Sequence, residues 1–359
     1  EEARYQNRRA RKRGKSSRDI VPLYTILDAL NALEYFGHTA RYNEALSLAP
    51  GIQATFSDAG HILGSTCILL ELTEDSRQRR VLFSGDLGLD RRPILRDPDK
   101  APVADIVVME TTYGDRQHKQ LEPSIEELHE VINATVSRGG NVIIPTFALE
   151  RAQEILFYLH AGKQDGILPD FLQVFLDSPM AISATEIFRR HPECYDEHTA
   201  SLFASGHDPF QFSGLHFTRE TADSMAINQI HSGAVIMAGS GMCTGGRIRH
   251  HLRQHLGREH SSIVFVGYAA HGTLARRIVD GAKIVNIFGD EYPVRAAIHT
   301  IGGFSAHAGQ TELLEWHRQT GNPEHTFLVH GEKDSMTAFS RLLKGTRVDM
   351  PQLHQAFDL

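Results

Sequence analysis

The sequence predicts an α/β protein in which a parallel sheet is covered by helices on both faces. From residue 124 onward, short apolar runs of strand length alternate with longer segments of helical periodicity. Several of these runs are apolar throughout, which is typical of strands buried on both faces of a parallel sheet. The chain of 359 residues also exceeds the usual size of a single hydrophobic core, so we expect two domains.

The predicted elements follow one another in a simple order. Residues 50–88 predict three strands, the last two joined by the polar turn TEDSRQRR. A helix is predicted to begin with a capping box of Ser124 and Glu127 and to end at Gly139. Four strand–helix pairs follow: NVIIPTF with ALERAQEILFYLHAG, QVFLDSP with AISATEIFRR, AVIMAGSGM with RIRHHLRQHL, and SSIVFVGY with TLARRIVDGA. After residue 295 we expect helix QTELLEWHRQ, strand HTFLVHGE and helix SMTAFSRLLKG.

Composition narrows the class of protein. The chain is 41% hydrophobic and 23% charged, as in ordinary soluble proteins, and no apolar run approaches the ~20 residues of a membrane span. Its three cysteines lie far apart and form no CxxC pair, so we expect no disulfide framework and a cytoplasmic location. The net charge of −7 argues against a generally basic nucleic-acid protein. Residues 4–18, however, hold eight Lys or Arg and no acid, which predicts a solvated face or, alternatively, a contact with a polyanion.

Polar residues collect where the predicted strands end. His61 in SDAGHILGS, Asp86 in LFSGDLG and His330 in LVHGE each follow or end a strand beside glycine. Imidazole and carboxylate groups are the ligands that Zn²⁺ takes in hydrolytic sites, and one carboxylate can bridge two ions. Taken singly, each residue has a structural alternative as a polar residue in a turn. Glycine-rich turns at several strand ends also favour an anion-binding cleft.

Nine motifs extend this pattern over nearly the whole chain. They are, in order, DAGHILGS, FSGDLG, METTYGD, PTFALERAQEIL, DSPMA, GSGMCTGGRIRHHL, GYAAHGTLARRI, GGFSAHAGQ and LVHGE. In this order they resemble the β-CASP branch of the metallo-β-lactamase superfamily, which includes the nuclease subunit of the pre-mRNA cleavage and polyadenylation factor and its bacterial and archaeal relatives. The resemblance implies a metallo-β-lactamase αββα sandwich, N-terminally incomplete here, with an inserted parallel-sheet β-CASP domain. The implied boundaries are residues 1–118 and 296–359 for the two lactamase parts and 119–295 for the inserted domain.

The same resemblance implies a role for each candidate residue. His61 corresponds to a ligand of one zinc ion, Asp86 to the carboxylate that bridges two zinc ions, and His330 to a ligand of the second. His307 corresponds to the general acid that protonates the leaving oxygen, and Glu110 to the acid that orients it.

The implied function is a zinc-dependent ribonuclease that hydrolyses phosphodiester bonds of single-stranded RNA in RNA processing or degradation, with two zinc ions per complete site. A histidine at the position of His330 accompanies RNA rather than DNA substrates in this family. The alternatives are a catalytically inactive β-CASP scaffold or RNA-binding subunit, and a DNA-directed nuclease. A homodimer is an open alternative for the oligomeric state.

The chain departs from the family pattern upstream of His61. The signature His-x-His-x-Asp-His is absent there, so we expect this sequence to bind zinc poorly and to be catalytically impaired. A smaller departure is GYAAHGT, where relatives more often carry glutamine directly after the tyrosine; His271 in this motif has no assigned role.

Contacts to RNA are predicted in two groups. The candidates for the RNA backbone are polar residues of the motif loops, for which a helix cap or an ordinary surface position is the alternative: Arg151, Ser178, Ser240, Arg247, Thr273 and Arg276. The candidates for base stacking are Phe147, Tyr113 and Tyr268, with core packing as the favoured interpretation of Phe147.

Overall fold

The computed structural model describes residues 3, 7, 8, 11, 20–22, 24–117 and 120–358. Most of the basic run predicted at residues 4–18 lies outside these residues. The chain divides into two compact units, residues 1–44 and residues 45–359. In the first unit, helix α2 (Ile26–Ala32) begins with a capping box between Thr25 and Asp28, and a 3₁₀ turn (Leu33–Tyr35) follows it. Among the described residues, no helix is long and apolar enough to cross a membrane.

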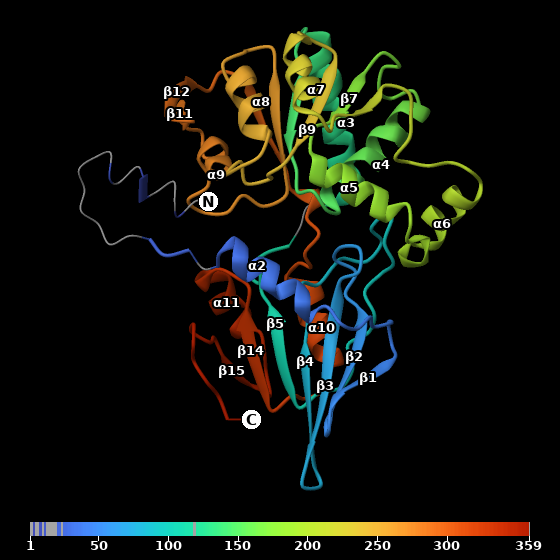
Figure 1. Ribbon diagram of the computed structural model, residues 1–359, viewed down its shortest axis with the longest axis vertical. Helices are drawn as coiled ribbons and strands as arrows, with labels where there is room; N and C mark the ends of the chain where they lie inside the picture. Colours follow the sequence, from blue (N-terminus) through green and yellow to red (C-terminus); the bar gives the residue numbers. More distant parts are fainter. Residues whose placement is uncertain are drawn as a thin grey trace. The chain divides into compact units, whose positions relative to one another are not determined.

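One sheet of the second unit has seven strands in the order β1-β2-β3-β4-β5-β14-β15 (Figure 1). Neighbouring strands are antiparallel from β1 to β4, and parallel from β4 through β5 and β14 to β15. The bounds are Ala45–Ala49, Ile52–Asp58, Thr66–Glu74, Arg77–Phe83, Ile106–Glu110, His325–Val329 and Arg347–Asp349. The first and last parts of this unit therefore build one sheet together, and the neighbouring strands β5 and β14 come from different parts of the chain.

The other large sheet has six strands, all parallel, in the order β13-β10-β6-β9-β7-β8. The bounds in that order are Ala297–Ile301, Ser262–Val266, Val142–Pro145, Ala234–Ala238, Gln173–Leu176 and Leu215–Phe217. A small hairpin, β11 (Ile284–Ile287) and β12 (Asp290–Pro293), precedes the last strand in sequence. Strand β13 lies just beyond residue 295, so the chain leaves this sheet only after Ile301.

Helices cover both faces of the six-stranded sheet, as the continuous apolar strands predict. Adjacent residues of one strand enter different cores: Ile143 packs in the core that contains Leu252 and Ile278, and Ile144 in the core that contains Leu128. Figure 1 accordingly shows α3, α4 and α5 on one side of this sheet and α8 and α9 on the other. The helix bounds are α3 Leu121–Ser137, α4 Arg151–Gln164, α5 Pro179–Phe188, α6 Glu197–Ala204, α7 Thr221–Ala226, α8 Ile248–His255 and α9 Leu274–Val279.

Helices α10 (Gln310–Gln319) and α11 (Lys333–Ser340) pack on one face of the seven-stranded sheet. Their side chains Leu313, Trp316 and Phe339 share a core with Leu82 and Leu328 of the strands. This packing holds the ends of β4, β5 and β14 in place, and the candidate site lies directly beyond these ends.

One predicted helix start is wrong. Helix α3 begins at Leu121 with Gln120 as its N-cap, one turn before the predicted capping box. The hydroxyl of Ser124 instead donates to the carbonyl of Gln120, because a serine inside the first turn bonds back along the helix. Pro123 is tolerated in this first turn, where backbone N–H groups have no partner within the helix.

Candidate metal centre

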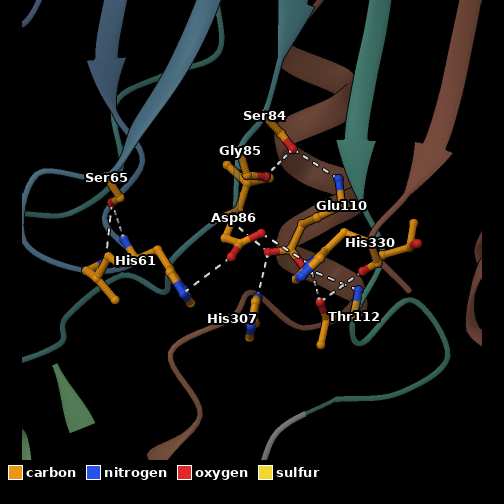
Figure 2. A network of polar contacts seen from close by, with 12 residues as sticks. His61, Ser65, Ser84, Gly85, Asp86, Glu110, Thr112, His307 and His330 are labelled. Carbon is orange, nitrogen blue, oxygen red and sulfur yellow. Dashed lines mark hydrogen bonds and ion pairs between the residues drawn. The ribbon is translucent and has the colours of Figure 1, made fainter. Parts of the chain in front are cut away.

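The carboxylate of Asp86 lies between two histidines (Figure 2). Asp86 follows β4 in a tight turn at Gly85, where φ is +56° and a Cβ atom would lie 2.6 Å from the carbonyl oxygen of Thr66. Its Oδ2 atom is 3.8 Å from Nε2 of His61, and its Oδ1 atom is 3.1 Å from Nδ1 of His330. Each carboxylate oxygen therefore faces a different imidazole, an arrangement that allows Asp86 to bridge two cations.

His61 is held in the loop between β2 and β3. Its backbone N–H donates to the hydroxyl of Ser65 at 3.0 Å, and its ring lies 4.4 Å from the ring of His307. Burial, followed by the charge of His307, lowers the pKa of His61 to about 4. At neutral pH the imidazole of His61 is therefore uncharged, which is the form that binds a metal ion.

His330 ends β14 in an uncommon backbone conformation. Its φ is +48°, in the left-handed region that a histidine adopts more readily than a β-branched residue. The next residue, Gly331, packs so closely against β5 that a Cβ atom would lie 2.6 Å from the carbonyl oxygen of Thr111. Thr112 donates through its hydroxyl to the His330 carbonyl at 3.1 Å. These contacts hold the backbone of His330 at the end of the sheet. The position of Gly331 directly after His330 agrees with the glycines that the sequence places beside the candidate ligands.

Glu110 and His307 form a buried acid–imidazole pair. Glu110 ends β5, and its Oε1 atom lies 3.0 Å from Nδ1 of His307. The same carboxylate accepts hydrogen bonds from the backbone N–H groups of Leu87 at 2.7 Å and Thr112 at 3.2 Å. Because three donors converge on it, Glu110 fixes the orientation of the His307 ring.

This pairing shifts the pKa of both groups in opposite directions. Burial alone would lower the pKa of His307, but the hydrogen bond and charge of Glu110 outweigh burial and raise it. Burial alone would raise the pKa of Glu110, but the interactions with His307, Thr112 and Leu87 lower it. The pair therefore favours a protonated imidazole beside a carboxylate, so His307 is able to hold a proton for transfer.

The five residues form two overlapping sets of possible ligands. His61, Asp86 and His307 each offer an atom within 4.8 Å of the others, and so do Glu110, His307 and His330. Three of these residues, Asp86, Glu110 and His330, lie at the ends of the neighbouring strands β4, β5 and β14. His61, Asp86, His307 and His330 line a cavity of about 510 Å³, and Glu110 adjoins it through His307. The lining also includes residues that follow strands of the six-stranded sheet: Phe147, Arg151, Met242 and Tyr268.

Two predicted RNA contacts are arginines already engaged in buried ion pairs. Arg151 lines the cavity, but it is buried and bonds to the carboxylate of Glu154. Arg247 donates to the fully buried carboxylate of Asp177 at 2.7 Å and to the carbonyl of Thr218 at 2.8 Å. Arg151 is therefore paired within α4, whereas Arg247 connects the start of α8 to the segments that follow β7 and β8.

The other four predicted contacts lie outside the cavity lining. Ser178 and Thr273 are the N-caps of α5 and α9. The hydroxyl of Ser240 bonds within its own loop, accepting from the backbone N–H of Gly245 at 3.3 Å. Arg276 is bound to Asp280 one turn along α9. Each of these four residues therefore has the kind of role, a helix cap or an ordinary surface position, that was given as the alternative to RNA binding.

The three predicted stacking residues differ in exposure. Tyr113 is buried, and its ring meets that of Tyr268 edge-on at 6.1 Å. Tyr268 lines the cavity and donates a hydrogen bond to Glu332, a carboxylate that His271 also approaches at 3.9 Å. The favoured interpretation of Phe147 as a core residue is wrong: its side chain is 49% exposed and lines the cavity.

Sequence analysis missed a second set of residues that supports the site. Arg92 donates to the carbonyls of Gly303 and Ser305, at 2.7 and 2.9 Å, in the segment that leads to His307. It also lies 3.2 Å from Glu154 of α4. No sequence signal predicts Arg92, because its partners are distant along the chain; Thr112, by contrast, stands two residues after Glu110 inside a recognised motif.

Comparison with known proteins identifies the family. The model of the β-CASP domain matches residues 152–278, and the model of the Zn-dependent metallo-hydrolase RNA specificity domain matches residues 291–351. Ribonuclease TTHA0252 of Thermus thermophilus is 40% identical over 313 residues, which cover 86% of this chain and 70% of that protein. The chain belongs to the β-CASP RNA nucleases of the metallo-β-lactamase superfamily.

More distant relatives carry a different name. Transcription termination factor FttA of Thermococcus kodakarensis is 34% identical over 328 residues, and that of Pyrococcus abyssi is 32% identical over 321 residues. The chain spans about half the length of these two proteins, with coverage of 49% of each. Family membership confirms the predicted fold class, a mixed α/β protein with an inserted β-CASP domain, and the predicted enzyme class, a metal-dependent ribonuclease.

Proposed function

We propose that this β-CASP nuclease hydrolyses phosphodiester bonds of single-stranded RNA at a pair of zinc ions. In this proposal His61 binds one ion, His330 binds the other and Asp86 bridges both. The observation that carries the proposal is the position of Asp86, whose two carboxylate oxygens face His61 at 3.8 Å and His330 at 3.1 Å. An isolated structural ion pair would engage one histidine; two on opposite sides suit a bridging ligand.

The residues present fit zinc in their chemistry. Imidazole nitrogen and carboxylate oxygen bind Zn²⁺ at about 2.0–2.2 Å, so one ion can span the 3.8 Å between Asp86 and His61. His61 is uncharged at neutral pH, and the name of the matching domain also indicates zinc. These three residues fill part of the coordination of two ions. Among the described residues, Glu110 and His307 also belong to the sets of possible ligands. The proposed mechanism assigns these two residues to proton transfer instead.

The residues of the chain supply the proton and its orientation. When bound, zinc lowers the pKa of water and neutralises charge on the phosphate. His307 has its Nδ1 fixed by Glu110, which leaves Nε2 to hold the proton that the leaving oxygen requires. The carboxylate of Glu110 stabilises the charged imidazole until that proton is transferred. Its own orientation is fixed by the N–H groups of Leu87 and Thr112.

The cavity supports a single strand as the substrate. The metal ligands and His307 lie in a recess shared with loops of the six-stranded sheet, and the cavity of about 510 Å³ is the size of a small-ligand site. A single strand can turn one phosphate into such a recess, whereas a duplex holds its phosphates on a rigid outer surface. Of the predicted contacts to the RNA backbone, Arg151 is the one that lines this cavity, and we propose it as such a contact.

The domain boundaries are part of this proposal. We propose that residues 1–118 and 296–359 form the lactamase parts around an inserted domain at 119–295. The sheet topology favours ending the inserted domain slightly later, because β13 pairs with β10. A homodimer stays a prediction.

The experiment that tests the function combines zinc content with cleavage of RNA. The 359-residue protein is freed of metal, titrated with zinc and mixed in excess with a 5′-labelled single-stranded RNA, its duplex and the DNA of the same sequence. Because the His-x-His-x-Asp-His signature is absent upstream of His61, we expect slow but zinc-dependent cleavage of the single-stranded RNA, in preference to the other two. Equal cleavage with and without a chelator would overturn the metal mechanism, and preference for DNA would overturn the substrate.

A further inference from the structure

Phe147 presents an aromatic side chain to the cavity that contains the candidate metal ligands. It follows β6 and precedes α4, and it is 49% exposed. Most other large apolar residues of this sheet are fully buried, including Ile143 and Ile144 of the same strand. A half-exposed phenylalanine beside a catalytic site requires an explanation other than core packing, since exposure forfeits part of the stabilisation that burial provides.

The backbone beneath the Phe147 ring is shaped to receive it. A Cβ atom on Gly241 would lie 3.0 Å from Cε2 and 3.1 Å from Cδ2 of Phe147, so the ring rests against a residue that has no side chain. The next residue, Met242, also lines the cavity, and its sulfur accepts a hydrogen bond from the backbone N–H of Ala270 at 3.3 Å. We call Phe147 and Met242 the apolar shelf. The two side chains come from loops after different strands: the Phe147 ring rests on Gly241 in the loop of Met242, and Met242 is bonded to the loop that contains Ala270.

The cavity is lined both by the apolar side chains of the shelf and by the polar side chains of the candidate metal ligands. Asp86, His330 and His307 line one part, and the shelf lines another part of the same cavity. Arg151 also lines this cavity, and its ion pair with Glu154 makes it a weaker site for a phosphate than the proposed metal ions. Phe147 and Met242 carry no hydrogen-bond donor that could bind an anion. A phosphate therefore belongs on the side of the metal ligands, and a flat apolar group belongs on the shelf.

A nucleobase is the flat group that is always attached to such a phosphate. Every base has a π face, so stacking on an aromatic ring binds a single strand with little dependence on sequence. A thioether beside the ring extends the apolar surface and tolerates bases of different size. An apolar peptide side chain would also fit the shelf, but it carries no phosphate for the adjacent polar part of the cavity.

We propose that the apolar shelf of Phe147 and Met242 is a base-stacking subsite for the nucleotide next to the phosphate that is cleaved. This proposal rests on the proposed function and adds to it the means by which the strand is held. The subsite predicts binding that depends on the presence of a base and hardly on which base, with purines favoured by their larger area.

The test combines a protein variant that lacks the Phe147 ring with an oligomer that lacks the bases. Binding of a short 5′-radiolabelled oligoadenylate, and of an oligomer of the same length made of abasic ribose phosphates, is measured by filter binding in the presence of a chelator. We expect Phe147→Ala to weaken binding of the oligoadenylate about 5- to 100-fold, the range for loss of one base–aromatic stack, and to leave binding of the abasic oligomer unchanged. Phe147→Trp should retain the preference for the oligomer with bases.

Phe171 provides a matched control. It is an exposed phenylalanine, 64% accessible, whose ring approaches Gly233, and it precedes β7, at the amino end of the parallel strands, whereas Phe147 follows β6 at their carboxyl end. Phe171→Ala should bind both oligomers as the unsubstituted protein does. Gly241→Ala provides a second route, because its methyl group would displace the Phe147 ring without removing it; we expect a smaller loss, again confined to the oligomer with bases.

Three results would overturn the subsite. These are an equal loss for both oligomers in Phe147→Ala, no loss for either, and binding of an apolar peptide that competes with the oligoadenylate at the shelf. Failure of the proposed function is distinguishable from these results, because it appears as absence of zinc-dependent cleavage, which the binding measurement does not require.

Discussion

The Oδ1 atom of Asp86 and the Nδ1 atom of His330 lie 3.1 Å apart, although the strands that they follow, β4 and β14, are separated by β5. The end of β5 contributes Glu110, so three adjacent strand ends provide the proposed bridging carboxylate, a carboxylate that contacts His307 and an imidazole. The parallel register of β5 and β14, with Val329 opposite Glu110, sets this alignment. We therefore propose different roles for Asp86 and Glu110, and substitutions can separate these roles.

Asp86→Ala should remove both zinc binding and cleavage. The substitution deletes the carboxylate that faces both His61 and His330, and loss of metal assistance worth several kcal/mol lowers the single-turnover rate by about 10³-fold or more. Zinc content by mass spectrometry and cleavage of labelled RNA measure the two effects. Asp90→Asn, four residues along the same loop, is the control and should retain both. An Asp86→Ala protein that keeps its zinc would contradict the bridging role.

His307→Gln and Glu110→Gln should each lower the rate of cleavage by about 10²–10⁴-fold, the usual contribution of a positioned proton donor. Because Glu110 acts through His307 at 3.0 Å, the double variant should be little slower than His307→Gln alone. Zinc content should stay unchanged in all three proteins. Loss of zinc from His307→Gln would instead make this residue a metal ligand, since it belongs to both sets of possible ligands.

Arg92→Ala should destabilise the protein by roughly 3–5 kcal/mol, because it leaves a buried carboxylate with one partner fewer and two carbonyls unpaired. Urea unfolding measures this change. The rate of cleavage should also fall, since Arg92 holds the carbonyl of Ser305 two residues before His307. Arg79→Ala, which removes an exposed ion pair with Glu324, should cost less than about 1 kcal/mol. Comparable losses in the two variants would show that burial of the Arg92 network contributes little.

Asp177→Asn should destabilise the protein by roughly 3 kcal/mol at neutral pH, and the difference should shrink in acid. Burial would raise the pKa of Asp177, but hydrogen bonds from His251, Ser224, Thr218 and Arg247 lower it to about 2. In an unfolded chain the pKa is about 3.9, so the stabilisation is present above that value and is lost as the pH falls through about 2.

Urea unfolding of both proteins from neutral pH into the acid range measures the change. Asp280→Asn, in the exposed pair with Arg276, is the matched control and should alter stability by less than about 1 kcal/mol. A difference between the wild type and Asp177→Asn that stays constant with pH would mean that the carboxylate is not the source of the stability.

The sequence predicts the helical and parallel part of this fold well. Helix α10 has the predicted bounds, Gln310–Gln319, and the four strand–helix pairs lie where apolar runs alternate with amphipathic ones. Strand β1 was not predicted, because Ala45–Ala49 is mostly exposed and lacks an apolar alternation. The start of α3 was misplaced because Ser124 has the composition of a cap but bonds to its own helix.

At the site, the predictions succeeded for residues that belong to motifs and failed where a residue's role depends on its tertiary contacts. His61, Asp86, Glu110, His307 and His330 are signalled by motifs; the structure brings four of them to one cavity and places Glu110 behind it, 3.0 Å from His307. The predicted contacts to RNA required side chains that have no intramolecular partner, and the tertiary structure determines which side chains have one. Arg247 looks available in sequence, yet Asp177, far away along the chain, neutralises it. Phe147 looks like a core residue in sequence, yet Gly241 leaves it room in the cavity.

The left-handed conformation of His330 and the close approach of Gly331 to Thr111 make the length of this segment as important as its composition. Side chains alternate between the two faces of a strand, so one residue inserted or deleted between His325 and His330 would turn the imidazole away from Asp86. Homologous proteins should therefore tolerate gaps in the loop after β5 but show none in β14, a pattern visible in any alignment before a single enzyme is assayed.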